Sequence, residues 1–255
     1  MNERSLESPK LKSNRIVQGL WIGPRLSAME QLSMASFLRH GHEYHLYVYG
    51  DVHGVPDGVR LLDANEILPE SSVFEYSEHK SYSGFSNQFR YEMLHRRGGW
   101  WVDTDVVCIK PFDFEAPIVL SEESGYDSPI VTTGIIKARK GSRFLRHMIE
   151  ICREKRNEDL KWGETGPRLL TATVDKFGLH SRAVSHRVFC PFGYKEWRKF
   201  IEPNCDLKFP DETHAVHFWN EMWRRAGKDK DGRFPATSIY ERLKARYLPR
   251  KTSEK

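Results

Sequence analysis

Two carboxylates, Asp103 and Asp105, lie one residue apart within an apolar run that extends over residues 100–109. Such a run predicts a buried strand, and a buried strand avoids an unpaired ionised Asp because desolvating the charge is costly. Two carboxylates at this spacing therefore require a divalent cation, a hydrogen-bonding ligand, or both. An exposed Asp-x-Asp turn at a strand end is the alternative, which the apolar residues on both sides disfavour.

Carboxylate oxygens are hard ligands that suit Mn²⁺ or Mg²⁺, and these ions take their remaining ligands from water and from substrate phosphates. We therefore predict a divalent cation at this pair. The net charge of +5 over 255 residues suits a polyanionic small ligand such as a nucleotide diphosphate. It does not favour a nucleic-acid partner, because the sequence has no basic stripe interleaved with aromatic residues.

Composition indicates a soluble globular protein, with 39% hydrophobic and 29% charged residues. The length suits one large α/β domain. None of the four cysteines belongs to a Cys-x-x-Cys pair, which argues against a zinc site and indicates reduced thiols. The polar first residues lack the apolar segment of a secretory signal, and no apolar run approaches the roughly 20 residues of a membrane span. We expect a cytoplasmic protein.

Alternating strands and helices in the first half predict βαβ units and a mainly parallel sheet. Strands are expected over residues 15–22, 44–49 and 59–62, and a capping box at Ser27 opens a helix that stops near Gly41. A further helix start is expected at residues 63–66. The second half is expected to contain strands over 118–120, 131–137 and 214–219, helices that begin at Ser142 and Pro167, and a last helix with Ile239, Leu243 and Leu248 on its buried side.

A helix over residues 84–97, capped by Ser83 and ended by two glycines, is predicted from large apolar residues that recur every four positions. Asn87 and Arg90 lie three residues apart and so share one face of this helix. The strand over 100–109 follows directly, so this face and the carboxylate pair are expected to lie close together.

We expect a single domain over residues 15–248, a disordered tail at 1–14 and a basic tail at 249–255. The last helix has a basic outer face. That face is expected to be solvated, although it would also allow peripheral contact with a membrane surface.

The segment 85–91, followed by 98–105, resembles the DXD sugar-binding region of glycosyltransferase family 32. The order of helix, Arg, double glycine and strand is the specific part of the match, since a bare Asp-x-Asp carries no information. The resemblance is most specific over 83–113 and extends over about 15–225, through Trp21-Ile22-Gly23, Thr165-Gly166-Pro167 and 217–223. Related groups include capsular polysaccharide transferases and outer-chain mannosyltransferases.

This resemblance implies a GT-A fold, in which a central, mainly parallel sheet is flanked by helices in the Rossmann-like manner of nucleotide-diphospho-sugar transferases. It implies metal-dependent transfer of a sugar from a UDP- or GDP-linked donor to a glycan or other hydroxyl acceptor, with retention at the anomeric carbon. Surface polysaccharide or glycoconjugate synthesis is the expected role. No residue stands out as a covalent nucleophile, and retaining members of this kind are thought to use the leaving phosphate as the proton acceptor.

By the same resemblance, Asp105 binds the metal, Asp103 contacts ribose or donor sugar and also reaches the metal, and His217 completes the metal shell. Arg90 would hold the donor sugar or a phosphate oxygen, and Trp21 would stack on the nucleotide base. The structural alternatives are a surface helix residue for Arg90 and core side chains for Trp21 and His217.

Asn87 stands where the family usually has Asp, which bears on the choice of donor sugar rather than on whether a sugar binds. Gly166 and Pro167 resemble the family's Gly-Pro before a helix, expected near the donor sugar. Asn220 and Trp223 follow His217 in the family's His-x-Trp…Trp pattern and are counted as substrate-binding residues.

The sequence is also compatible with two other functions. Residues 102–107 also fit the first motif of haloacid-dehalogenase-type Mg²⁺-dependent phosphatases, in which Asp103 would be the nucleophile. That motif requires a later acidic pair, and neither Glu122-Glu123 nor Asp211-Glu212 is well placed for it. A non-catalytic nucleotide-sugar-binding module is the other alternative, disfavoured because the proposed metal ligands are intact.

Overall fold

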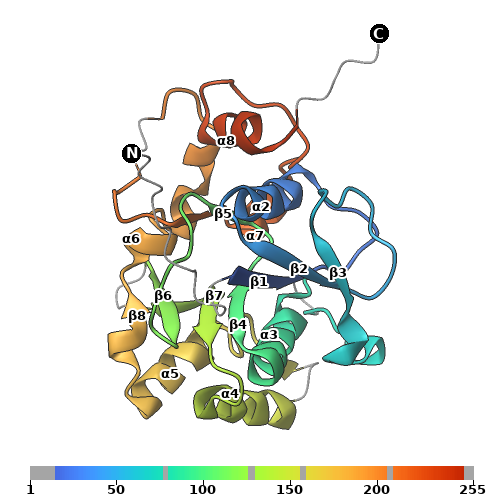
Figure 1. The fold of residues 1–255 in the computed structure, drawn as a ribbon, viewed down its shortest axis with the longest axis vertical. Coiled ribbons are helices and arrows are strands. Elements are labelled where there is room, and N and C mark those ends of the chain that lie inside the picture. Colours follow the sequence, from blue (N-terminus) through green and yellow to red (C-terminus); the bar gives the residue numbers. More distant parts are fainter. Residues whose placement is uncertain (1–14, 77–79, 126–129, 156–158, 206–208, 250–255) are drawn as a thin grey trace, which may run out of the picture.

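A seven-stranded sheet forms the centre of the protein, with helices on both faces (Figure 1). The computed structural model describes residues 15–76, 80–125, 130–155, 159–205 and 209–249. The strands of this sheet, in chain order, are β1 (Ile16–Leu20), β2 (Glu43–Val48), β3 (Arg60–Asp63), β4 (Gly99–Val102), β6 (Val119–Glu123), β7 (Ile130–Ala138) and β8 (Ala183–Val184).

The sheet is mixed and mainly parallel, as predicted. Its order is β3-β2-β1-β4-β7-β6-β8. The first four of these strands pair in parallel, β7 is antiparallel to both of its neighbours, and β8 is parallel to β6. The carboxyl ends of β1 and β4 therefore lie at the same edge, which is where ligands bind in open α/β sheets.

Two hydrophobic clusters lie on opposite faces of the sheet. One cluster packs beneath α3 (Ser83–Arg97), α4 (Arg143–Glu154) and α5 (Pro167–Phe177), which lie together in the lower half of Figure 1. The other packs against α2 (Ala28–Arg39) and α8 (Ile239–Tyr247) in the upper half. The short helices α6 (His186–Phe189) and α7 (Asn220–Arg225) complete this side of the molecule.

The predicted helix boundaries are confirmed where caps are strong. Ser27 forms the expected capping box with Glu30 at the start of α2, and α5 begins at Pro167 and ends before Gly178. At residues 64–66 the structure has only one 3₁₀ turn, capped by Asp63, because Pro69 soon follows. Ser142 lies at the N-cap position of α4 but makes no capping hydrogen bond.

The helix over 84–97 is confirmed as α3, but Ser83 is not its cap. Tyr82 holds the N-cap position, and its carbonyl accepts the first helical hydrogen bond, from Ser86 N at 2.8 Å. At the other end, Gly98 has a φ of +71° and lies so close to the next hairpin that a Cβ there would be 2.7 Å from Lys140 N. Only glycine fits this junction between α3 and β4.

The prediction of one continuous strand over residues 100–109 is wrong. Strand β4 ends at Val102, and β5 (Val106–Cys108) pairs instead with β9 (Ala215–His217) in a separate two-stranded sheet. Between them, Val106 N donates to Asp103 O at 3.0 Å and closes a turn. The two carboxylates therefore lie in a turn outside the central sheet. This turn is not the exposed Asp-x-Asp turn considered above, because Asp105 is only 8% exposed.

The predictions for the tail at 1–14, and for 250–255 of the C-terminal tail, lie outside the described residues. Within the described ranges, no helix combines the length and the apolar character needed to cross a membrane.

Candidate active site

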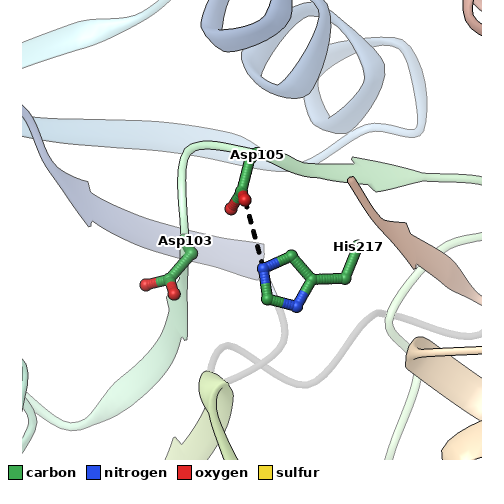
Figure 2. A group of neighbouring side chains, drawn as sticks. All are labelled: Asp103, Asp105 and His217. Carbon is green, nitrogen blue, oxygen red and sulfur yellow. Dashed lines mark ion pairs between the residues drawn. The ribbon is translucent and has the colours of Figure 1, made fainter. Parts of the chain in front are cut away.

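Asp103, Asp105 and His217 converge beyond the end of β4 (Figure 2). One ligand atom from each residue lies within 4.8 Å of those of the other two. The turn between β4 and β5 supplies both carboxylates, and β9 supplies the imidazole because His217 pairs in register with Val106 of β5. The antiparallel β5–β9 pair is therefore what brings the distant His217 to the carboxylates.

Asp105 is fixed by the start of α7. Its Oδ2 accepts a hydrogen bond from Asn220 N at 2.7 Å and lies 3.2 Å from His217 Nε2. Trp219, whose φ is +59°, turns the backbone so that this N–H points at the carboxylate. Burial acts to raise the pKa of Asp105, but His217 and the Asn220 N–H stabilise the carboxylate more strongly, and the net effect lowers the pKa.

The imidazole of His217 is buried and stacks on Trp219, with ring centroids 4.0 Å apart. Burial alone would lower the pKa of His217, but the Asp105 carboxylate outweighs it and holds the pKa well above its ordinary value. In the metal-free protein the two residues therefore form a buried ion pair. A metal at this group must displace the proton of His217.

Arg90 is a buried residue of α3 and not a surface helix residue, because its side chain is only 3% exposed. Its NH2 lies 3.1 Å from Asp103 Oδ1, and its NH1 donates to Thr133 O at 2.5 Å. Trp101 Nε1 donates to the same Asp103 oxygen at 2.8 Å. The guanidinium of Arg90 and the indole of Trp101 thus hold the Asp103 carboxylate in one orientation, as expected for a preorganised metal ligand.

Asn87 lies beside Gly166, and Pro167 follows Gly166 directly in the chain. A Cβ on Gly166 would be 2.9 Å from Asn87 Nδ2, so a larger residue at this position would displace the Asn87 amide. Thr133 Oγ1 donates to Asn87 Oδ1 at 3.3 Å, and Pro167 is the first residue of α5. The predicted neighbourhood of helix α3 and the Gly-Pro loop is therefore present.

Asn220 contacts Asp105, and Trp21 lies in the segment that directly follows β1. Trp21 follows the carboxyl end of β1, is half-buried, and has Lys230 Nζ 5.6 Å from its ring centroid. The contact from Asn220 to Asp105 comes from the backbone N–H, and its buried Oδ1 lacks a partner among the described residues.

Trp223 is not brought to the site. It is fully buried, and its Nε1 donates to Phe218 O at 2.9 Å. Its ring packs in an aromatic cluster with Trp197, Phe218, Phe234 and Tyr240. The structure therefore corrects its predicted role in substrate binding to one in core packing.

Sequence reasoning missed Gly134 and Thr133 of β7. A Cβ on Gly134 would lie 3.1 Å from His217 Cε1 and 3.3 Å from Asp103 Oδ2, so the missing side chain leaves room between two of the candidate ligands. The signal was a glycine inside the strand pattern of 131–137, which marks a close approach to a backbone or ligand.

The residues present fit a divalent cation. The donors are two carboxylates and one imidazole, and the space beside them is the one that a Cβ on Gly134 would fill. Among the described residues, Trp21 Nε1 and Asn220 Oδ1 are buried atoms without a hydrogen-bond partner. Because such atoms are rare in folded proteins, they are consistent with a polar ligand.

A cavity of about 930 Å³ lies at the opposite edge of the sheet. Gln18, Gly98 and Gly99 line it near the amino ends of β1 and β4. It contains none of the three clustered ligands, so we do not place the active site there.

The mixed sheet, with the carboxylate turn after β4, has the architecture of the GT-A glycosyltransferase fold. A solved structure titled "PaToxG Glycosyltransferase" has this fold, with a TM-score of 0.51 and 16% identity, covering 66% of this chain and 72% of that one. The galactosyltransferase LgtC, solved with donor and acceptor sugar analogues, is a weaker match, with a TM-score of 0.45 and 10% identity over 80% of this chain and 86% of that one.

Residues 27–124 match the glycosyltransferase sugar-binding region containing the DXD motif, and residues 137–253 match the alpha 1,4-glycosyltransferase conserved region. The chain belongs to these DXD-containing glycosyltransferases of the family 32 type. Human alpha-1,4-N-acetylglucosaminyltransferase is 24% identical over 212 residues, which cover 74% of this chain. The match spans 59% of the length of that relative.

We expect the Mn²⁺ affinity of the protein to rise with pH through the neutral range. Below its raised pKa, His217 carries a proton that the ion must displace, so each unit of pH decrease should weaken binding by up to about tenfold. Calorimetric titrations with Mn²⁺ at pH 6.5 and 7.5 check this. His217→Gln, which has no titrating ring, should show a much flatter dependence, and a flat profile in the unmodified protein would contradict the assignment.

Proposed function

We propose that this protein is a metal-dependent, retaining glycosyltransferase that moves a sugar from a UDP- or GDP-linked donor to a hydroxyl of a glycan or similar acceptor. Synthesis of a surface polysaccharide or glycoconjugate is the proposed setting. The observation that carries the proposal is the convergence of Asp103, Asp105 and His217 beside the buried Arg90. The name of the matching conserved region, an alpha 1,4-glycosyltransferase, supports transfer with retention.

Asp103, Asp105 and His217 would hold Mn²⁺ or Mg²⁺, which when bound supplies Lewis-acid stabilisation of charge on a departing diphosphate. Arg90 adds a fixed positive charge beside Asp103. Because it is buried and oriented by three hydrogen-bonding groups, little reorganisation is needed as negative charge develops nearby.

Asn87 and Trp21 are assigned to the two ends of the donor. The Asn87 amide, held against Gly166 and Thr133, would hydrogen-bond a hydroxyl of the donor sugar. The half-buried ring of Trp21, at the end of β1, would stack on the nucleotide base. The acceptor hydroxyl would pass its proton to the leaving phosphate in a front-face displacement.

The two alternative functions lack comparable support. A haloacid-dehalogenase-type phosphatase would use Asp103 as a nucleophile, yet in this structure Asp103 is engaged by Arg90 and Trp101. Within the described residues, the third candidate metal ligand beside Asp103 and Asp105 is a histidine rather than a further acidic residue. A non-catalytic binding module is disfavoured because both conserved regions of the transferase family are present.

Thermal unfolding with a panel of UDP- and GDP-sugars, with and without Mn²⁺, tests the proposal. A donor at 100 times its Kd should add about 2.7 kcal/mol to the unfolding free energy, and it should do so only with the metal. Release of the sugar from the stabilising donor is then measured directly. An equal shift in the presence of a chelator, or hydrolysis of simple aryl phosphates in place of nucleotide-sugars, would contradict the proposal.

Asn87→Asp is expected to change the preference among donor sugars and to leave Mn²⁺ binding intact. The side chain is isosteric and lies beside Gly166, away from the three clustered ligands, but it gains a negative charge and loses a donor. A site that reads hydroxyl groups is sensitive to such a change. Ratios of kcat/KM across the donor panel check this, and unchanged ratios would reject the role of Asn87.

A further inference from the structure

Asn220, the first residue of α7, lies directly beside the clustered carboxylates. Its backbone N donates to Asp105 Oδ2 at 2.7 Å. The left-handed conformation of Trp219, with a φ of +59°, fixes the backbone at this point. Covalent geometry keeps the amide oxygen of an Asn side chain within about 5 Å of its own backbone N. Asn220 Oδ1 therefore lies within about 8 Å of Asp105 Oδ2 in any rotamer.

The amide oxygen of Asn220 is buried and has no hydrogen-bond partner in the described part of the chain. N–H groups of the site are directed at other acceptors. Trp219 Nε1 donates to Phe192 O at 2.9 Å, and Arg90 NH2 donates to Ser86 Oγ at 2.9 Å. A carbonyl oxygen that leaves water on folding costs free energy unless a donor or a cation replaces the water. Such an oxygen in a folded protein indicates a water or an ion next to it.

The surroundings of this oxygen favour a cation. The carboxylates of Asp103 and Asp105 are acceptors themselves and offer Asn220 Oδ1 no hydrogen. His217 Nε2 already faces Asp105 Oδ2 at 3.2 Å. Carboxylate and amide carbonyl oxygens are ligands that suit Mn²⁺ and Mg²⁺. The missing side chain of Gly134 leaves room beside two of the three clustered ligands. One divalent ion would therefore satisfy acceptors that the protein alone leaves close together.

We propose that Asn220 Oδ1 is a fourth ligand of the divalent cation, beside Asp103, Asp105 and His217. The inference rests on the proposed function, which requires the cation. One residue then acts twice, because its N–H orients Asp105 and its carbonyl oxygen completes the ligand set. The fourth ligand is also neutral. Two carboxylates balance the charge of the ion, whereas a third would make the site negative and would repel a diphosphate.

The test measures Mn²⁺ binding to the donor-free protein, by electron paramagnetic resonance of the free ion and by water-proton relaxation of the bound ion. Asn220→Ala should weaken the Mn²⁺ affinity by about 10- to 100-fold. It should also raise the relaxation enhancement of the bound ion, because a water takes the vacated position. Asn220→Asp should bind Mn²⁺ at least as tightly as the unmodified protein, yet its Mn²⁺-loaded form should bind UDP or GDP more weakly. Both variants keep the N–H that orients Asp105.

The matched control is Glu221→Ala, at the next residue of α7. The Glu221 carboxylate accepts from Arg225 Nε at 2.6 Å, so its loss should change the Mn²⁺ affinity less than about twofold. The thermal transition of each metal-free variant shows that it is folded.

Asn220→Ser separates an ion from a water at this position, because a serine hydroxyl can hydrogen-bond a water but does not extend as far as the amide oxygen. It should weaken Mn²⁺ binding as Asn220→Ala does. Full affinity in this variant would overturn the proposal, and so would an Asn220→Ala variant with unchanged Mn²⁺ affinity and relaxation, even if its KM for the donor rose. A failure of the unmodified protein to bind Mn²⁺ would refute the proposed function together with this inference.

Discussion

Replacement of Asp105 by Asn is expected to reduce sugar transfer by about a thousandfold or more, equivalent to about 4 kcal/mol of transition-state stabilisation. The amide preserves the shape of the side chain and can still accept the Asn220 N–H, which lies 2.7 Å from Asp105 Oδ2. It removes the charge that faces His217 and that would hold the divalent cation. Initial rates with saturating donor and Mn²⁺ give the measurement.

Glu92→Gln is the control for this experiment. Glu92 is a buried carboxylate of α3 that accepts from Arg153 at 2.6 Å, on the side of the helix that faces α4. Glu92→Gln breaks a buried charge pair, as Asp105→Asn does, so it should lower the free energy of unfolding to a comparable extent. It should not alter the dependence of the transfer rate on Mn²⁺. An Asp105→Asn variant that bound and turned over the donor as the unmodified protein does would refute the metal site.

Gly134→Ala is expected to weaken Mn²⁺ binding by about 10- to 100-fold while the sheet remains folded. The new methyl group would stand 3.1 Å from His217 Cε1 and 3.3 Å from Asp103 Oδ2, so both candidate ligands must move apart to admit it. Affinity is measured by titration with Mn²⁺, and folding by the thermal transition of the metal-free protein.

Gly50→Ala is the matched control, because a Cβ at Gly50 meets no atom within 4 Å. It should leave the Mn²⁺ affinity unchanged. If Gly134→Ala also left the affinity unchanged, the space beside His217 and Asp103 would have no role in accommodating the ion, and the fit of the site to a metal would lose its main geometric support.

The parts of the fold that depend on local chemistry could be predicted from the sequence. The capping box at Ser27, the glycines after α3 and the proline that opens α5 each fix a boundary through interactions within a few residues. The identity of the three clustered ligands was also accessible, because carboxylate spacing and the resemblance together single out Asp103, Asp105 and His217.

The break between β4 and β5 could not be read from the apolar run, because it depends on pairing with a segment far along the chain. Val106, Val107 and Cys108 are fully buried as the run predicts, but their partners are residues 215–217 and not the central sheet. Burial indicates that a segment is inside the protein without indicating which neighbour covers it.

The same limit explains the error at Trp223. The His-x-Trp…Trp pattern places Trp223 near His217 in sequence, yet α7 turns the ring away from Asp105 and into the aromatic cluster with Trp197 and Tyr240. Gly134 was missed for the opposite reason. Its contribution is the absence of a side chain, which has meaning only when His217 and Asp103 are seen on either side of it.

The pairing of β5 with β9 makes the two conserved regions of the chain a single functional unit. Asp103 and Asp105 belong to the region over 27–124, and His217 belongs to the region over 137–253. A cation held by all three would act as a cross-link that closes a long chain loop, and so would stabilise the folded protein as a whole. Either region expressed alone would lack part of the ligand set, so loss of contact between the halves and loss of metal affinity should occur together.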